Sequence, residues 1–149
     1  MSGAPITDLH LVGWAQEKLL LPLLERIAGE PLEKTSRRYD TIDFEGETTC
    51  VELKCRNAYD KNGRLVTANS FDTWLMPATK IDYAKVNKKR TIFVYHFLGC
   101  QTTWYIVYRN DLLVGLNVER PVWHSRMSDH YYIPKALWTQ WNPDAENVV

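Results

Sequence analysis

Apolar residues recur at helical spacing near the start of the chain. Within residues 7–28 they follow one face of a helix, Thr7 or Asp8 is a candidate N-cap, and Gly29 suits the C-terminal cap. Pro22 falls inside the segment and favours a kink, because proline cannot donate to the preceding turn. The pattern predicts an amphipathic helix over 7–28.

Two short runs rich in β-branched and aromatic residues follow. Residues 38–44 and 48–56 favour extended structure, and the Glu-Gly-Glu sequence at 45–47 is typical of a short turn. The pattern therefore predicts a β-hairpin. Residues 57–72 are polar and contain an Asn-Gly pair, which indicates a loop with a turn.

The second half of the chain returns to helix and then to strand. Pro77 is suited to the first position of a helix, and the apolar positions after it predict a short amphipathic helix over 77–89. Residues 91–97 and 103–109 alternate as two strands of a second hairpin, and 112–118 is a candidate further strand.

The order of these elements sets the expected fold. Residues 121–141 have the composition of a loop with one short helix beginning near Pro134. Helix, hairpin, strand, helix and strand in this order indicate an α/β (α+β) protein with a central mixed β-sheet flanked by helices. At 149 residues the chain fits a single domain, 1–149.

Composition narrows the class of protein. With 45% apolar and 12% aromatic residues the chain can bury a core. No apolar run approaches the roughly 18 residues of a membrane span, and no secretory leader is evident, so we expect an intracellular, cytoplasmic protein that is not secreted. Three cysteines, Cys50, Cys55 and Cys100, are expected to be reduced.

Charge is balanced overall and uneven along the chain. The formal net charge is zero, which argues against a binder that coats nucleic acid with positive charge. Residues 34–90 carry a surplus of Lys and Arg, whereas the rest is net acidic. A local basic face therefore remains possible, beside the alternative that these charges are only solvated.

The first predicted hairpin concentrates acidic residues. If the turn at 45–47 pairs Phe44 with Thr48, Asp40 lies opposite Glu52, on one face of the sheet. Two carboxylates held so close repel each other unless a cation or a proton intervenes, and oxygen ligands of this kind suit Mg²⁺. A slip of one residue in the register would put the two acids on opposite faces.

The first predicted helix supplies a third acid. Glu17 falls on the apolar stripe that includes Leu20, Leu24 and Ala28, and Gly13 one turn earlier leaves room for close approach. A carboxylate that faces a core is costly unless a charged group meets it. Beside Asp40 and Glu52 we favour a site, although a pairing with a lysine would also explain Glu17.

These residues resemble a known family. "GWAQE" at 13–17, Asp40, and "ELK" at 52–54, in the order helix, hairpin, helix, are similar to the core of the PD-(D/E)xK nuclease superfamily. The likeness covers roughly residues 10–97 and is greatest to small nucleases of large DNA viruses and phages, resolvase-like or restriction-endonuclease-like in core. Tyr39 stands where the family's proline would be.

The resemblance implies a catalytic set and a cofactor. Mg²⁺ or Mn²⁺ would be held by the metal ligands Asp40, Glu52, the backbone carbonyl of Leu53, and Glu17. Lys54 would orient the attacking water or stabilise negative charge on the phosphate, and Lys80 on the following helix would approach the phosphate. For Lys80, a solvated lysine is the alternative interpretation.

Further residues are candidates for contact with nucleic acid. The expected contacts are Arg38, Arg56, Lys61, Arg64 and Tyr83, with Asn69 in the same loop as Lys61. His10 shares the face of Glu17, and a histidine ligand occurs in cap-snatching relatives, although a core or capping role is the alternative. His124 and His130 lie six apart without cysteines, which is poor spacing for zinc.

The sequence hypothesis is therefore a metal-dependent phosphodiesterase, an endonuclease that acts on DNA rather than RNA. If the protein is viral, it would act inside the host cell. A homodimer is plausible, because paired cuts are often made by two-fold assemblies. The alternatives are a non-catalytic nucleic-acid-binding or scaffold protein that retains the nuclease fold, and an RNA endonuclease of the cap-snatching type.

Overall fold

The structure is a computed structural model that describes residues 8–35, 42–112, 114, 118–119 and 129–142. For residues 8–15 and 118–119 only the backbone is described. The elements in chain order are α1 (Asp8–Ala28), β1 (Glu33–Lys34), β2 (Phe44–Glu45), β3 (Thr49–Arg56), the 3-10 helix η1 (Ala68–Ser70), β4 (Thr73–Pro77), α2 (Ala78–Val86), β5 (Arg90–Phe97), β6 (Thr102–Val107), β7 (Val118–Glu119), β8 (His130–Pro134), the 3-10 helix η2 (Lys135–Leu137) and β9 (Thr139–Gln140).

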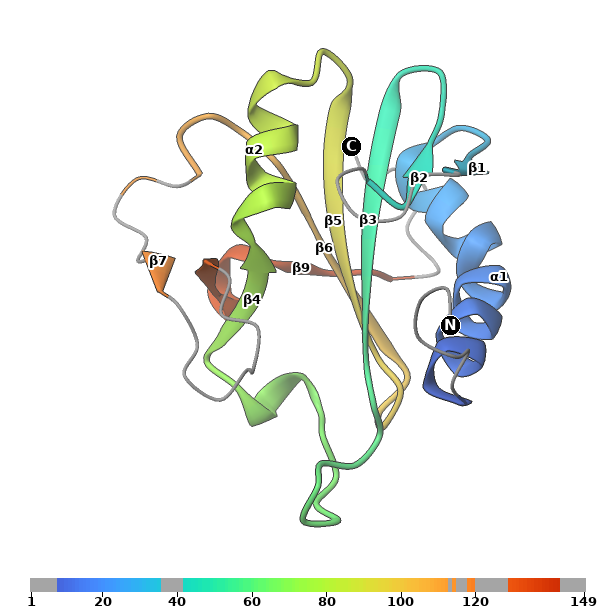
Figure 1. Ribbon diagram of the computed structural model, residues 1–149, viewed down its shortest axis with the longest axis vertical. Helices are drawn as coiled ribbons and strands as arrows, with labels where there is room; N and C mark the ends of the chain where they lie inside the picture. Colours follow the sequence, from blue (N-terminus) through green and yellow to red (C-terminus); the bar gives the residue numbers. More distant parts are fainter. Residues whose placement is uncertain (1–7, 36–41, 113, 115–117, 120–128, 143–149) are drawn as a thin grey trace, which may run out of the picture.

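These elements form an α+β fold with two sheets. The larger sheet has six strands in the order β1-β2-β3-β5-β6-β9, and the smaller has three in the order β4-β8-β7. β3 and β5 pair in parallel, and the other pairs are antiparallel, so the larger sheet is mixed. The chain crosses from β3 to β5 through β4 and α2, and α1 lies on the opposite side of the sheet (Figure 1).

The core lies on both faces of the larger sheet. Alternate residues of β5 point to opposite faces, as the two-residue period of a strand requires. Phe93, Tyr95 and Phe97 pack with β4 and α2 around Trp74, which is fully buried. The other face packs against α1 through a second cluster of buried residues: Leu24, Ile27, Ala28, Leu32, Phe44, Val51, Leu53, Ile92, Val94 and Trp141.

The helices confirm most of the helix predictions. α1 continues through Pro22 and ends at Ala28, where Gly29 adopts φ 78° and its N–H donates to the Glu25 carbonyl at 2.8 Å. Glycine adopts this left-handed conformation without steric cost, which explains the end of the helix here. α2 is shorter than the predicted 77–89, with Pro77 as its N-cap.

The strand predictions are confirmed in part. The hairpin of β5 and β6 is present, and β3 matches the predicted 48–56. The expectation of an irregular segment before Pro134 is wrong, because His130–Pro134 forms β8 and pairs with β4. Of the candidate strand 112–118, only Val118 lies in a described strand. Residues 38–41 lie outside the described part.

No helix in the described part of the chain is long and apolar enough to cross a membrane.

Candidate active site on the edge of strand β3

Glu52 is the centre of the candidate site. It lies in the middle of β3, on the face that packs against α2, and only 2% of it is exposed. Two lysines approach its carboxylate: Lys80 Nζ lies 3.6 Å from Oε1, and Lys54 Nζ lies 4.0 Å from Oε2. Lys80 is itself buried, so the interpretation of it as a solvated helix lysine is wrong.

The carboxylate of Glu52 is not fully satisfied. Its Oε1 atom is buried without a hydrogen-bond partner among the described residues, although buried polar atoms are normally paired. Burial, followed by the negative charge of Asp43, raises the pKa of Glu52 to about 7, against the opposing effect of Lys54 and Lys80. A positive ligand at Oε1 would relieve both the desolvation and the repulsion.

Asp43, rather than the predicted Asp40, is the described acid beside Glu52. The register pairs Phe44 with Val51, so the predicted pairing of Phe44 with Thr48 is wrong. Extended by one residue, the observed register brings Asp43 opposite Glu52. Asp40 lies outside the described residues, and its predicted role stays a prediction.

Asp43 is bonded to the open edge of β3. Its Oδ2 accepts a hydrogen bond from the Leu53 N–H at 2.9 Å. Its own backbone N–H donates a hydrogen bond to the Glu52 carboxylate. In a strand, the N–H and the carbonyl of one residue point to the same edge. The carbonyl of Leu53, a predicted metal ligand, therefore faces the same edge as the Asp43 carboxylate.

A contact from the end of α1 explains the register. The Glu30 carboxylate accepts hydrogen bonds from Thr48 N–H at 2.8 Å and from the Thr48 hydroxyl. Gly46 N–H donates to the Thr49 carbonyl at 2.8 Å, which closes a turn with only Glu47 and Thr48 between the bonded residues, in place of the predicted three-residue turn 45–47. Because Glu30 holds Thr48 in this turn, Thr48 cannot pair with Phe44.

Lys34 joins the two remaining acids of the site. Its Nζ lies 3.0 Å from Glu17 Oε2 and 3.5 Å from Asp43 Oδ1. Burial opposes the charge on Lys34, but Asp43 and Glu17 outweigh it and raise the pKa of this lysine. The ammonium group therefore sits between two carboxylates, a position that a metal cation could also take. Glu17 pairs with a lysine, which was the alternative interpretation of this residue, and its role as a metal ligand stays a prediction.

Comparison with protein-family models, with curated proteins and with solved structures found no match. Within the described residues, no group of three or more His, Cys, Asp or Glu side chains is arranged to hold a metal ion. The function must therefore be inferred from the geometry of this site.

The remaining predicted residues fall into four groups. Arg56 follows Lys54 on the same face of β3 and lies over two aromatic rings. Lys61 and Arg64 are exposed on the loop that extends beyond β3 (Figure 1). Tyr83 lies beside Cys50 and the hairpin turn, away from the Glu52 carboxylate. Arg38, His124 and the side chain of His10 lie outside the described part.

Sequence reasoning missed two residues, Asp43 and Lys34. Asp43 follows Ile42, so the sequence "ID" before "ELK" was an available signal for an acid on the first hairpin strand. Its choice over Asp40 depends on the turn, which the sequence alone did not resolve. Lys34 lies in a two-residue strand without any distinguishing pattern, and only its distances to Glu17 and Asp43 mark it.

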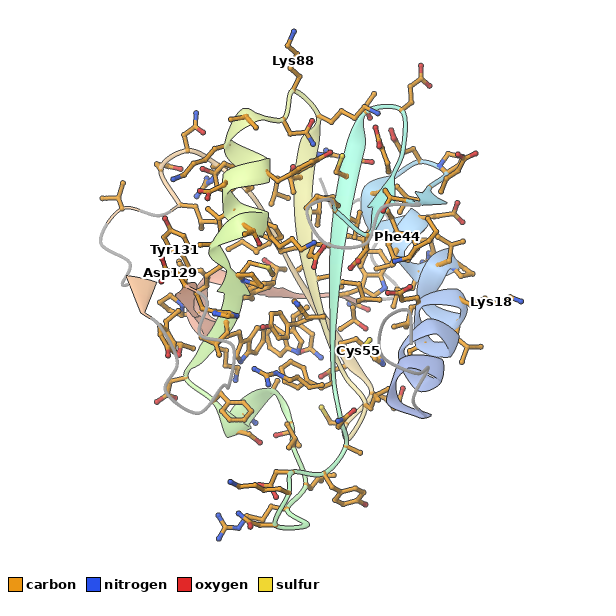
Figure 2. All side chains as sticks on the ribbon, in the orientation of Figure 1. Lys18, Phe44, Cys55, Lys88, Asp129 and Tyr131 are labelled. Carbon is orange, nitrogen blue, oxygen red and sulfur yellow. The ribbon has the colours of Figure 1, made fainter. Side chains whose placement is uncertain are left out.

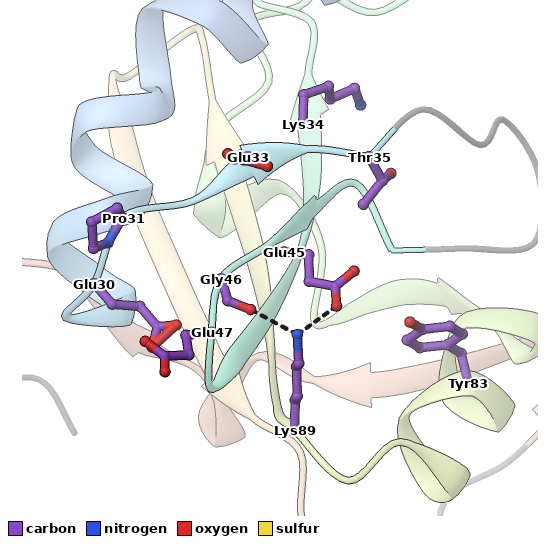
Figure 3. A pocket seen from close by; sticks show the side chains of 10 residues that line it. All are labelled: Glu30, Pro31, Glu33, Lys34, Thr35, Glu45, Gly46, Glu47, Tyr83 and Lys89. Atoms are coloured by element: carbon purple, nitrogen blue, oxygen red, sulfur yellow. Dashed lines mark hydrogen bonds and ion pairs between the residues drawn. The ribbon is translucent and has the colours of Figure 1, made fainter.

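A large pocket lies at the other end of the hairpin and has the wrong charge for nucleic acid. It has a volume of about 770 Å³ and is lined by four glutamates, Glu30, Glu33, Glu45 and Glu47, with Lys34 and Lys89 among its other residues (Figure 3). Lys89 is already bonded to Glu45 at 2.5 Å and to the Gly46 carbonyl at 2.8 Å. An acidic lining repels a polyanion, so we place the candidate site at Glu52.

Proposed function

We propose that the protein is a divalent-metal-dependent nuclease that hydrolyses phosphodiester bonds. One observation carries the proposal: Glu52 keeps a buried carboxylate oxygen without a hydrogen-bond partner where Asp43, Lys54 and Lys80 converge. A structural ion pair would gain from satisfying that oxygen, because an unpaired buried polar atom costs roughly 1–3 kcal/mol. An oxygen reserved for a ligand is the simplest reason for that cost.

The residues fit Mg²⁺ or Mn²⁺. Asp43, Glu52 Oε1 and the Leu53 carbonyl supply hard oxygen donors, and Glu17 can join them if Lys34 moves aside. Mg²⁺ commonly takes one or two carboxylates and completes its octahedron with water and phosphate oxygens, so the small number of acids is adequate. When bound, the ion would polarise the scissile phosphate and promote ionisation of water.

The chain's own residues supply the rest of the mechanism. Lys54 is half-exposed beside Glu52, where its ammonium group can orient the attacking water and stabilise charge on the phosphate oxygens. Lys80, held by α2 against Glu52, adds positive charge from the buried side. In the reaction, water oxygen bonds to phosphorus, the bond to the leaving oxygen breaks, and that oxygen takes up a proton.

The substrate class rests on charge and on resemblance. Cations continue from Lys54 to Arg56 along β3, then to Lys61 and Arg64 on the loop beyond it, which supports a backbone-binding track. The order of the elements, with acids on the hairpin and Lys80 on the crossover helix, supports a restriction-endonuclease-like core. We infer DNA rather than RNA, and internal cleavage, from the resemblance alone.

A second function is favoured by Lys34. Because its ammonium group already neutralises Glu17 and Asp43, the acids could form a structural ion network in a non-catalytic nucleic-acid-binding protein. The two functions differ in their response to metal. A structural network gains no stability from Mn²⁺, whereas a metal site is stabilised in proportion to its occupancy.

The experiment compares thermal stability and cleavage in one set of proteins. Wild type, Asp43→Asn and Asp40→Asn are heated with Mn²⁺ or EDTA, and each is assayed on plasmid, linear duplex, single-stranded DNA, a branched junction and RNA. We expect Mn²⁺ at 100 times its Kd to raise the wild-type Tm by about 5–10 °C, and this gain to be lost in Asp43→Asn. Metal-dependent cleavage should disappear with it.

Asp40→Asn tests the alternative acid directly. If Asp43 is the ligand, Asp40→Asn keeps both the Tm gain and cleavage. If instead Asp40→Asn loses both and Asp43→Asn keeps them, Asp40 is the ligand. No Tm gain and no cleavage of any substrate by the wild type would leave the non-catalytic function. Cleavage confined to RNA would indicate the cap-snatching type.

A further inference from the structure

We propose that a small pocket beside Lys54 binds a backbone phosphate of the nucleic acid a few nucleotides from the one that is cleaved. This inference rests on the proposed nuclease function and adds a subsite to it. The pocket has a volume of about 160 Å³ and is lined by Lys54, Cys55, Arg56, Leu75, Pro77, Tyr95 and His130.

The lining has the chemistry of an anion site. Lys54, Arg56 and His130 contribute nitrogen donors, and none of the described residues that line the pocket is acidic. The ammonium group of Lys54 and the guanidinium group of Arg56 are charged donors that can bond to phosphate oxygens. The lining of the large pocket at the hairpin turn is the opposite, with four glutamates.

Arg56 is held in place by aromatic rings. Its guanidinium carbon lies 5.3 Å from the centre of the Phe71 ring and 5.8 Å from the centre of the Tyr95 ring. Tyr95 is buried and its hydroxyl donates to the Leu75 carbonyl, so the ring beneath Arg56 is itself fixed. An arginine ordered by stacking loses less side-chain entropy when it binds phosphate.

The pocket is continuous with the candidate active site. Glu52, Lys54 and Arg56 alternate along β3 and so lie on one face, and Lys54 belongs to both the site and the pocket. At about 3.3 Å per residue, Arg56 is roughly 13 Å from Glu52 along the strand. A nucleic-acid strand advances about 3.4 Å per nucleotide in a duplex, so the bound phosphate lies within about four nucleotides of the cleaved bond.

Pro77 and His130 close the far side of the pocket. They are paired in the smaller sheet, where β4 meets β8, and Pro77 directly precedes the helix that carries Lys80. The second sheet therefore has a role in substrate contact, because it provides the wall opposite β3. Without the β4–β8 pair the cations of β3 would lie on an open surface.

The test is a phosphate-interference experiment at nucleotide resolution. End-labelled oligonucleotides carry one neutral methylphosphonate at successive positions, and cleavage products are mapped with Mn²⁺ for wild type, Arg56→Gln and Arg56→Lys. Arg109→Gln is the matched control, since Arg109 is exposed beyond the end of β6 that pairs with Ile92, at the opposite end of the sheet from Arg56. Thermal unfolding confirms that each variant is folded.

We expect one position, at a fixed distance from the cut, where the neutral group lowers wild-type kcat/KM about tenfold, the scale of one charge-assisted hydrogen bond. Arg56→Gln should show a similar loss on the unmodified strand and no further loss at that position. On the unmodified strand, the kcat/KM of Arg56→Lys should lie between those of wild type and Arg56→Gln. The kcat/KM of Arg109→Gln should match that of wild type. The slope of log affinity against log salt should fall by about 1 in Arg56→Gln.

Equal interference in wild type and Arg56→Gln would overturn the subsite, and so would an effect confined to a terminal 5′-phosphate. If the unmodified strand is not cut at all, the nuclease function fails separately, and the subsite is then tested by binding of the unmodified oligonucleotide in EDTA. There, equal affinities of Arg56→Gln and Arg109→Gln would overturn it, and a selective loss in Arg56→Gln would support it.

Discussion

Glu30 contacts the turn of the β2–β3 hairpin from outside, whereas Glu52 belongs to β3 and lies toward the open end of the hairpin. Glu30 accepts hydrogen bonds from the N–H and hydroxyl of Thr48, and these bonds lower its pKa. Glu52 is buried with one oxygen that accepts no hydrogen bond, and burial together with Asp43 raises its pKa to about 7. The carboxylate that fixes the turn accepts hydrogen bonds, whereas the carboxylate that we propose as a metal ligand keeps one oxygen without a hydrogen bond.

The surroundings of the two acids differ in the same way. Around Glu30 the lysine nearest the turn, Lys89, is already bonded to the backbone of Gly46 and to Glu45 (Figure 3). Around Glu52, two lysines stand at 3.6 and 4.0 Å, too far for a direct hydrogen bond. The carboxylate at the turn therefore has hydrogen-bond donors in contact with it, whereas the two lysines beside Glu52 stay beyond hydrogen-bond distance.

The largest expected effect separates the two acids by activity. Glu52→Gln and Asp43→Asn should each lower metal-dependent cleavage by at least about 10²-fold, because each removes a negatively charged oxygen ligand of the proposed metal ion. Glu30→Gln, which keeps an oxygen acceptor for Thr48, should cleave within about twofold of wild type. Initial rates on the preferred substrate measure this, and an equal loss in Glu30→Gln would break the distinction.

A smaller effect tests how the turn fixes the site. A Cβ on Gly46 would lie 2.8 Å from the Pro31 carbonyl oxygen and would collide with Glu30 Oε2, so Gly46→Ala must push the turn away from the segment that follows α1. We expect it to lower the free energy of unfolding by about 1–3 kcal/mol, in the range of other overpacked sites.

Gly63→Asn is the matched control for this change. Gly63 has φ 76° and nothing within 4 Å of an added Cβ, and asparagine tolerates that conformation. Urea denaturation should therefore place Gly63→Asn close to wild type. If Gly46→Ala were equally stable, the contact between α1 and the turn would not determine the register.

The last expected effect is a pH dependence of stability that has opposite signs for the two acids. Glu52, faced by Asp43, Lys54 and Lys80, has its pKa raised from 4.5 to about 7. Its ionisation is thus disfavoured in the folded state, and without metal the stability of wild type relative to Glu52→Gln should fall as pH rises from 4.5 to 7. Glu30 has a lowered pKa, so its advantage over Glu30→Gln should appear above pH 4.5 and be lost as pH falls below it.

Urea denaturation in EDTA at intervals between pH 4 and 8 measures both differences. Saturating Mn²⁺ should make the stability difference between wild type and Glu52→Gln less dependent on pH, because a bound cation favours the ionised carboxylate. It should leave the difference between wild type and Glu30→Gln unchanged. Parallel curves for wild type and Glu52→Gln would contradict the raised pKa.

The sequence predicted what depends on local pattern. The α1 stripe was readable from spacing, and buried Leu24 and Ala28 bear it out. The strand period placed Glu52 and Lys54 on one face, the resemblance added Lys80, and the structure brings both lysines within 4.0 Å of the Glu52 carboxylate. Lys18 on α1 and Lys88 after α2 are exposed and extend away from the core (Figure 2).

Long-range contacts account for what the sequence did not predict. The hairpin register depends on Glu30 and Thr48, which are 18 residues apart, and no propensity of the turn residues encodes that bond. The pairing of β4 with β8 joins segments separated by the whole of β5 and β6. The sequence therefore did not predict that these strands form one wall of the proposed phosphate pocket. The role of Lys34 could be recognised only from the structure, in which its ammonium group contacts Glu17 of α1 and Asp43 just before β2.

The larger sheet ends in a two-residue strand on each side, β1 at one edge and β9 at the other. A strand this short offers another chain too few backbone donors and acceptors for stable pairing, which is how natural sheets resist growth into aggregates. If two copies of the protein do associate, they would meet through side-chain surfaces, and a shared sheet running through the dimer is not the expected architecture.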